Sequence, residues 1–283
     1  MNHVEALLSH APLRFRLLSV VTRWSWPRGM FLRLLNAAVP GLCTHFVARK
    51  MEIEEWVRAW LGALSREPEL ATPGRSACGR LVIVASGLDT LGFRLSLEPQ
   101  APLVVEIDHP ATQVVKQLWR RVMPASGSGR WELLPCDLAS GLINQLPPTT
   151  IRESSTVRSL FVLEGLLMYL DETAVRTLLR ELTQVARVGD AAIVTFMSKT
   201  SAGFVGFEGS KSEAVSRWLS RQSEPFLWGL SPAQAGDFFR SCGWELRQLS
   251  DPGSREKRME PRSRGVAAAA RGEHIALLIL SSP

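Results

Sequence analysis

The stretch that decides the fold is residues 81–110, which read LVIVASGLDTLGFRLSLEPQAPLVVEIDHP. It holds two short apolar runs, at 81–84 and 103–107, and the first is followed at once by the small-residue turn 85–87. Short β-branched runs bounded by turn residues are typical of parallel strands that are covered on both faces. The sequence therefore predicts a strand, a tight turn, a helix and a second, parallel strand.

An acid at the tip of the second run fits nucleoside binding. Asp108 lies 21 residues after Gly87. In doubly wound sheets, an acid about 20 residues after the first turn binds the ribose hydroxyls. An ordinary βαβ unit that binds no nucleotide could have the same spacing, so that alternative stays open.

The composition of the turn disfavours a diphosphate ligand. A pyrophosphate site needs a glycine-rich turn and an open helix N-terminus. Here Gly87 is followed by Asp89, whose negative charge would lie beside the phosphates, and Thr90 stands where a third glycine would be. NAD and ATP are therefore disfavoured. S-adenosylmethionine carries an ammonium and a sulfonium and has no phosphate, so it suits an acidic turn better.

Composition and cysteine usage set the broad class of the protein. The 283 residues are 46% hydrophobic and 21% charged, which is typical of a soluble globular protein. The sequence has no uncharged apolar run of 18 residues, so we expect no membrane span. The four cysteines are far apart and form no C-x-x-C pair. That pattern favours reduced thiols, a cytoplasmic location and no metal site.

The net charge of +6 is concentrated at the N-terminus, because residues 1–50 hold seven Lys or Arg and one acid. A basic segment of this kind could attract an anionic substrate, a membrane surface or nucleic acid, or could simply be a solvated arginine-rich face.

The remaining pattern predicts two parts of the chain. Residues 1–75 are expected to form an N-terminal helical cap, with short helices over 5–39 and a clear apolar stripe over 53–64. Residues 76–283 are expected to form an α/β domain. It would be a seven-stranded, mostly parallel sheet, of the Rossmann-like class I methyltransferase type. The expected strands lie at 81–84, 103–107, 131–135, 159–163, 191–197, 244–250 and 274–280.

Three acids stand at or just past the ends of successive strands: Asp108, Asp137 and Glu164. In open α/β sheets, ligands bind outside the carboxyl ends of the strands, so these acids can face one crevice. Each one alone could equally be a helix cap or a solvated loop residue. Together they could bind the ribose hydroxyls, the adenine amine and the methionine ammonium of one ligand through charge-assisted hydrogen bonds.

Several segments together are similar to the leucine carboxyl methyltransferase family. They are VIVASGLDTLGFRL (82–95), VEIDHP (105–110), CDL (136–138), LEGLLMYL (163–170), WGL (228–230) and GW (243–244). The resemblance implies a Rossmann-like methyltransferase that uses S-adenosylmethionine. It also implies a set of cofactor-binding residues, namely Arg49, Ala85, Ser86, Gly87, Asp108, Asp137, Leu138 and Glu164.

The resemblance assigns parts of the cofactor to these residues. Arg49 matches an arginine that reaches the methionine carboxylate, and Glu164 matches the acid near the methionine ammonium. Two positions depart from the family pattern. Ala85 stands where the family has glycine, and its Cβ could crowd the ligand. His109 stands where the family more often has a larger apolar or amide residue.

The expected reaction is O-methylation, with a methyl ester on a small-molecule carboxylate favoured. A carboxylate is already ionised at neutral pH and needs no general base, whereas a phenol would need one. No catalytic residue is assigned, although Tyr169 and His109 are candidates for the acceptor pocket. The expected acceptor is small and either anionic or apolar-aromatic, rather than a nucleic acid. The alternatives are a protein C-terminal carboxyl methyltransferase and a cofactor-binding protein that transfers no methyl group.

Overall fold

The computed structural model describes residues 41–66, 79–122, 131–142, 157–200, 203–208, 225–250, 253, 255 and 269–281. The expected short helices over 5–39 and most of the basic N-terminal segment lie outside the described residues. The proposed division of the chain at residue 75 also falls outside them. It stays a prediction.

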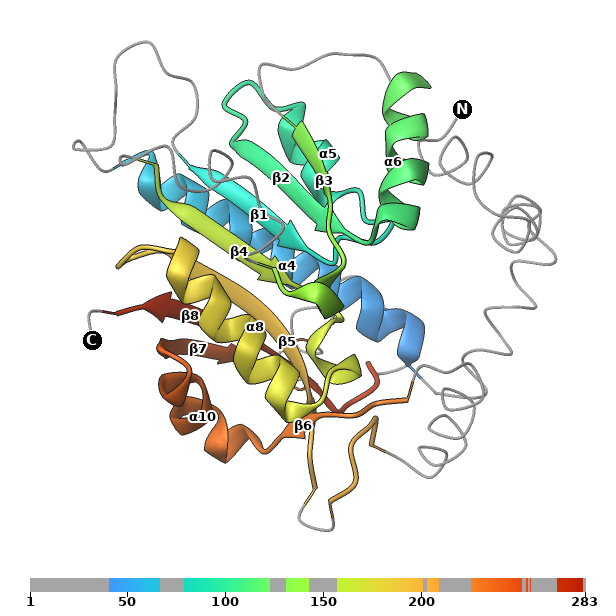
Figure 1. The fold of residues 1–283 in the computed structure, drawn as a ribbon. Coiled ribbons are helices and arrows are strands. Elements are labelled where there is room, and N and C mark those ends of the chain that lie inside the picture. The colour runs from blue at the N-terminus through green and yellow to red at the C-terminus, as the bar shows by residue number, and fades with distance from the viewer. Residues whose placement is uncertain are drawn as a thin grey trace, which may run out of the picture.

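An eight-stranded mixed sheet forms the centre of the molecule (Figure 1). Its strands run in the order β3-β2-β1-β4-β5-β8-β7, and β6 pairs with β5 off this path. The first five strands are parallel to one another, whereas β8 is antiparallel to both β5 and β7. The strands are β1 (Arg80–Val84), β2 (Leu103–Asp108), β3 (Trp131–Pro135), β4 (Ser159–Leu163), β5 (Ala191–Ser198), β6 (Gly229–Leu230), β7 (Trp244–Ser250) and β8 (Glu273–Leu280).

The Rossmann-like class is confirmed, and the sheet has one strand more than predicted. All seven expected strands are present. The additional strand, β6, has two residues, and its Gly229 pairs with Met197 of β5. Two residues are too few to show the alternating pattern of a strand, so β6 could not be predicted from sequence periodicity.

Helices lie on both faces of the sheet, with α4 behind it and α8 in front of it in the view of Figure 1. The described α-helices are α4 (Leu42–Leu64), α5 (Leu91–Ser96), α6 (Pro110–Val122), α8 (Glu172–Val185) and α10 (Ala235–Ser241). Short 3-10 helices follow three of the strands: η2 (Leu138–Ser140), η3 (Leu167–Tyr169) and η4 (Pro232–Gln234).

Successive residues of the central strands face opposite layers of the core. In β1, Val82 and Val84 belong to the apolar cluster shared with α8 and α10, whereas Leu81 and Ile83 belong to the cluster shared with α4 and α5. Every residue of β1 is buried. This explains why the strand reads as a continuous apolar run rather than as an alternating pattern.

Helix α4 packs the predicted stripe against the sheet and is longer than predicted. Ile53, Trp56 and Val57 are buried in the cluster that contains Leu81 and the other α4-facing residues of the strands. The helix begins at Leu42, directly after Gly41, whose φ of 79° lies in the left-handed region. Its first three turns therefore extend beyond the apolar stripe and carry charged side chains to the edge of the sheet.

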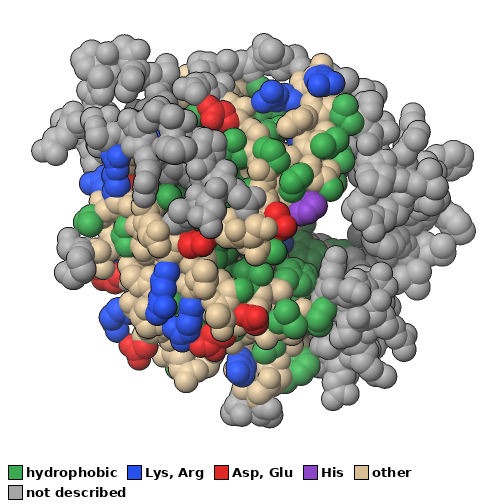
Figure 2. Space-filling view, in the orientation of Figure 1, with side chains coloured by type: hydrophobic (Ala, Val, Ile, Leu, Met, Phe, Trp, Pro, Cys, Tyr) green, Lys and Arg blue, Asp and Glu red, His purple; other side chains and the backbone are tan. Residues whose placement is uncertain are grey.

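Basic and acidic side chains are interspersed over the described part of the face in Figure 2.

None of the helices that the structure describes is both long enough and apolar enough to span a bilayer.

Candidate functional site

A cavity of about 500 Å³ opens at the point where the strand order reverses, between β1 and β4. Ligands of open α/β sheets bind at such switch points, outside the carboxyl ends of the strands. The cavity is bordered by the loop after β1, by the loop after β4 and by one turn of α4. Its lining residues are Arg49, Lys50, Ala85, Ser86, Gly87, Leu88, Asp89, Thr90, Glu164 and Gly165.

The loop after β1 is a tight turn that Asp108 holds in place. Ala85 and Gly87 both have positive φ, at 55° and 51°. Asp108, at the end of β2, accepts hydrogen bonds from the backbone N–H groups of Gly87 and of His109. A Cβ placed on Gly87 would meet no atom within 4 Å, so the turn presents an open backbone surface.

Arg49 connects α4 to two acids on different strands. Its Nε donates to Glu164 Oε1 at 2.8 Å, and its Nη1 donates to Glu273 Oε2 at 2.9 Å. Glu164 follows β4, and Glu273 begins β8. Burial alone would lower the pKa of Arg49, but the two carboxylates outweigh it and raise the pKa. The guanidinium is therefore a fixed positive charge at this edge of the sheet.

Glu273 holds Arg49 from the buried side of the site. Its side chain is fully buried, and its Oε2 lies 2.6 Å from Nε2 of His45, which is fully buried as well. Burial by itself would raise the pKa of Glu273, but Arg49 and His45 outweigh that effect and lower the pKa to about 2. Glu273 is therefore ionised throughout the physiological range.

Lys50, the next residue of α4, spans the mouth of the cavity. Its Nζ lies 2.6 Å from Asp89 Oδ2 and 2.9 Å from Glu164 Oε2. Its side chain is 45% exposed, whereas those of Asp89 and Glu164 are 16% and 7% exposed. Burial would raise the pKa of Asp89, but the Lys50 ammonium outweighs it and lowers the pKa. The ammonium of Lys50, which solvent can reach, thus joins the loop after β1 to the loop after β4.

A second charged group lies behind the turn. Lys116 of α6 forms an ion pair with Glu106 of β2, and both side chains are fully buried. The Lys116 ammonium also donates to Ser86 Oγ at 3.0 Å. Burial raises the pKa of Glu106 in spite of the neighbouring lysine. The turn is therefore held on its inner side by a buried ion pair.

The structure brings five of the eight predicted cofactor residues into the cavity lining: Arg49, Ala85, Ser86, Gly87 and Glu164. Asp108 adjoins it through its bond to the turn. Asp137 and Leu138 follow β3, at the far side of β2, and lie outside the lining. Asp137 there accepts a hydrogen bond from the Ala139 N–H at the start of η2.

The two candidate acceptor residues lie outside this cavity. His109 is exposed just before α6, and its Nδ1 accepts a hydrogen bond from the Ala111 N–H at 3.2 Å. Tyr169 is 37% exposed at the end of η3, and its ring centroid lies 5.8 Å from that of Phe226. Their part in acceptor binding stays a prediction.

Sequence reasoning missed Lys50, Glu273 and the pair of Glu106 with Lys116. Lys50 had a usable signal, because it adjoins Arg49 in the sequence. Glu106 also had one, since a single acid stands inside an otherwise apolar strand. Glu273 had none, because its partners lie more than 220 residues earlier in the chain.

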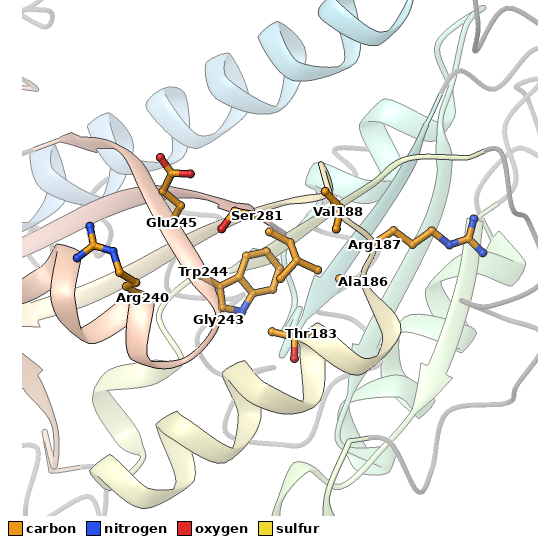
Figure 3. A pocket seen from close by; sticks show the side chains of 10 residues that line it. Thr183, Ala186, Arg187, Val188, Arg240, Gly243, Trp244, Glu245 and Ser281 are labelled. Atoms are coloured by element: carbon orange, nitrogen blue, oxygen red, sulfur yellow. The ribbon is translucent and has the colours of Figure 1, made fainter. Parts of the chain in front are cut away.

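A larger cavity, of about 910 Å³, opens at the opposite ends of the strands. Figure 3 shows the residues that line it, with the Arg187 side chain directed away from the others. It lies where β5 and β7 begin and β8 ends, at the amino ends of the parallel strands. Ligands of doubly wound sheets bind at the other end, so we assign the functional site to the smaller cavity.

Comparisons with known proteins agree with this fold. A provisionally assigned methyltransferase from Thermobifida fusca superposes with a TM-score of 0.61 at 14% identity, over 99% of this chain and 94% of that one. A DUF574 family protein from Streptomyces avermitilis superposes with a TM-score of 0.56 at 15% identity, over 87% and 88% of the two chains. No curated protein matches the sequence.

The family model described as leucine carboxyl methyltransferase matches residues 12–183. That range includes Arg49, the turn after β1, Asp108 and Glu164, which are the residues that meet around the cavity. The match covers more than half of the chain and both halves of the strand-order switch. The protein therefore belongs to the leucine carboxyl methyltransferase family, a family of S-adenosylmethionine-dependent methyltransferases.

Proposed function

We propose that the protein transfers the methyl group of S-adenosylmethionine to a carboxylate oxygen of a small molecule and so forms a methyl ester. The observation that carries this proposal is the cavity at the strand-order switch, where acids and bases from α4, β1 and β4 converge. The family membership supplies the donor, and the chemistry of the lining favours the kind of acceptor.

The charges around the cavity suit a cationic donor. Three carboxylates, of Asp89, Glu164 and Glu273, surround the two cations Arg49 and Lys50. These five side chains therefore have one negative charge in excess. S-adenosylmethionine carries a sulfonium, an ammonium and one carboxylate, which leaves one net positive charge. A diphosphate ligand would meet the same acids with the wrong sign.

We assign the parts of the donor to residues in the cavity lining and along the carboxyl ends of the neighbouring strands. Glu164 binds the ammonium, and Arg49 binds the carboxylate. The open backbone of Ser86 and Gly87 lies against the methionine chain. Asp108 binds the ribose hydroxyls through lone pairs that its two backbone contacts leave available. Asp137 and Leu138, further along the same edge of the sheet, bind the adenine.

The lining of the described cavity favours an acceptor that needs no base. It contains no histidine, and its acids are engaged by Arg49 and Lys50. A carboxylate has a reference pKa of about 4, so it is ionised at neutral pH without help. A phenol, with a pKa of about 10, would require a proton acceptor at the site.

In this mechanism the protein aligns the two reactants and keeps their charges in place. When bound, S-adenosylmethionine would supply the methyl group to the nucleophilic oxygen, with its methyl–sulfur bond breaking and neutral S-adenosylhomocysteine as the leaving group. Arg49 is held rigidly by Glu273, so it can fix the position of the donor's carboxylate without reorganising. The Lys116–Glu106 pair holds Ser86 and with it the turn. Such positioning can supply a large share of a rate enhancement in reactions that need no proton transfer.

The test is methyl transfer from labelled donor to a panel of small carboxylic acids, with the matching phenols as the comparison. An ester product releases its label in mild base, whereas an ether does not. Labelled product that resists base would contradict the proposed acceptor and favour a hydroxyl. Transfer only to the C-terminal carboxylate of a protein would instead support a protein C-terminal carboxyl methyltransferase.

A cofactor-binding protein without methyl transfer is the remaining candidate. One observation favours it: Ala85 has a Cβ at a positive φ, in the turn that faces the ligand. Formation of S-adenosylhomocysteine in step with consumption of any acceptor would exclude this candidate.

A further inference from the structure

Glu164 is engaged by two cations of the same helix turn. Its Oε1 accepts from Arg49 Nε at 2.8 Å, and its Oε2 accepts from Lys50 Nζ at 2.9 Å. The carboxylate is nearly buried, with 7% of its side chain exposed. A ligand ammonium that approaches Glu164 therefore meets an acid whose two oxygens already have positively charged partners.

The two cations differ in how firmly they are held. Arg49 also binds the fully buried Glu273, and its own side chain is 12% exposed. Lys50 has Asp89 as its other partner, and nearly half of its side chain reaches solvent. Releasing a long, exposed lysine into water costs little, whereas breaking a buried pair costs several times more. Lys50 is thus the cation that a ligand can displace.

We propose that Lys50 is an internal substitute for the donor's ammonium: it neutralises Glu164 in the free protein and is exchanged for the ligand's ammonium on binding. This inference rests on the proposed function, because it takes Glu164 as the ammonium site. Two consequences follow. Lys50 lowers the affinity for every ligand that must displace it, and ligands without an ammonium leave it in place and gain nothing from its removal.

The test compares two ligands and two proteins in a calorimetric cycle. S-adenosylhomocysteine carries the amino-acid ammonium, whereas 5′-methylthioadenosine has the same nucleoside and thioether without the amino acid. We expect Lys50→Met to lower the Kd for S-adenosylhomocysteine about fivefold, the effect of removing one competing surface ion pair. The Kd for 5′-methylthioadenosine should change by less than about twofold.

Three further variants control the experiment. Lys50→Arg keeps the competing charge and should bind S-adenosylhomocysteine as the wild type does. Lys50→Gln removes the charge with a different side chain and should reproduce the Met variant, which guards against a folding defect in either one. Arg58→Met removes a positive charge from the same helix, where Arg58 pairs with Glu54 and Glu98 away from the cavity, and should leave both affinities unchanged.

The possible outcomes separate the inference from the function on which it rests. Weaker binding of S-adenosylhomocysteine by Lys50→Met would overturn it, because Lys50 would then contact the ligand directly. An equal gain for both ligands, or no change for either, would overturn it as well. If the wild-type protein bound neither ligand, the proposed function itself would fail. Wild-type binding with an unchanged Lys50→Met variant would leave that function intact and remove the exchange.

Discussion

The Cβ of Ala85 raises the conformational energy of the turn after β1. Ala85 is the one non-glycine residue with positive φ in the part of the chain that the structure describes. An L-residue in this conformation costs about 1–2 kcal/mol, because its Cβ approaches the backbone carbonyl oxygen. The turn nevertheless forms, since Asp108 and the buried Lys116–Glu106 pair hold it from two sides.

Replacing Ala85 with glycine tests this cost. We expect Ala85→Gly to raise the free energy of unfolding by up to about 1 kcal/mol, because the relieved strain exceeds the entropy that glycine adds to the unfolded chain. Urea denaturation measures the change. Ala139→Gly, in η2 where the backbone φ is not positive, is the matched control and should not stabilise the protein. A loss of stability in Ala85→Gly would contradict the strain.

The buried Lys116–Glu106 pair behind the turn can be tested by its contribution to stability. Lys116→Met would leave the Glu106 carboxylate without its counter-charge, and breaking one side of a buried ion pair costs about 3–5 kcal/mol. Adding Glu106→Gln to that variant removes the unpaired charge and should restore much of the loss. The measurement is chemical denaturation of the two single variants and the double variant. Additive losses in the double variant would show that the two side chains do not depend on each other.

At the scale of elements, α4 carries both structural and functional residues. Its C-terminal half buries Ile53 and Val57 against the sheet, and its N-terminal half carries Arg49 and Lys50 to the cavity. Ile53→Ala should destabilise the protein by about 2–5 kcal/mol, because it removes a fully buried side chain. Val47→Ala, at a position that is 52% exposed on the same helix, should cost far less. Equal losses would mean that the stripe is not what holds the helix.

The elements that sequence alone predicted are those whose signals are local. The runs at 81–84 and 103–107 gave β1 and β2 because each is short, apolar and bounded by turn residues. The first turns of α4 were missed, because buried His45 and the charged pair after it interrupt the apolar stripe. Strand β6 was missed because it exists only through its pairing with β5.

At the scale of the whole molecule, one buried acid connects parts of the chain that are distant in sequence. Glu273 has a pKa of about 2, below its ordinary value of 4.5. The unfolded chain therefore takes up a proton at this residue before the folded protein does. The stabilisation is complete above pH ~5 and is lost as the pH falls toward 2, by about 3 kcal/mol in all.

This pH dependence can be isolated with one variant. The difference in unfolding free energy between the wild type and Glu273→Gln should shrink by about 3 kcal/mol between pH 5 and pH 2. Taking the difference removes the contributions of acids that titrate alike in both proteins, Glu106 among them. Glu245→Gln, on the edge strand β7 and with a side chain that is 38% exposed, should show no such trend. A difference that stays constant with pH would mean that Glu273 has the same pKa in the folded and the unfolded protein.

The candidate site was predictable where the fold brings strand ends together and unpredictable where it joins distant segments. Asp108 and Glu164 could be placed because they stand at the carboxyl ends of β2 and β4, the two parallel strands that flank β1. Asp137 was expected in the same crevice, but β3 lies two strands away from the switch point, so it reaches another part of that edge. The contacts of Arg49 with Glu273 cross 224 residues and had no local signal.

The position of Arg49 and Lys50 on α4, one turn before its buried stripe, has a kinetic consequence. If the helix swings off the sheet, the pocket loses one of its walls in the same event. A bound ligand should therefore slow amide hydrogen exchange along the whole of α4, including the turns around Trp56 that it never touches. The frequency of that opening then sets the rate at which an occupant held by Arg49 can escape by this route.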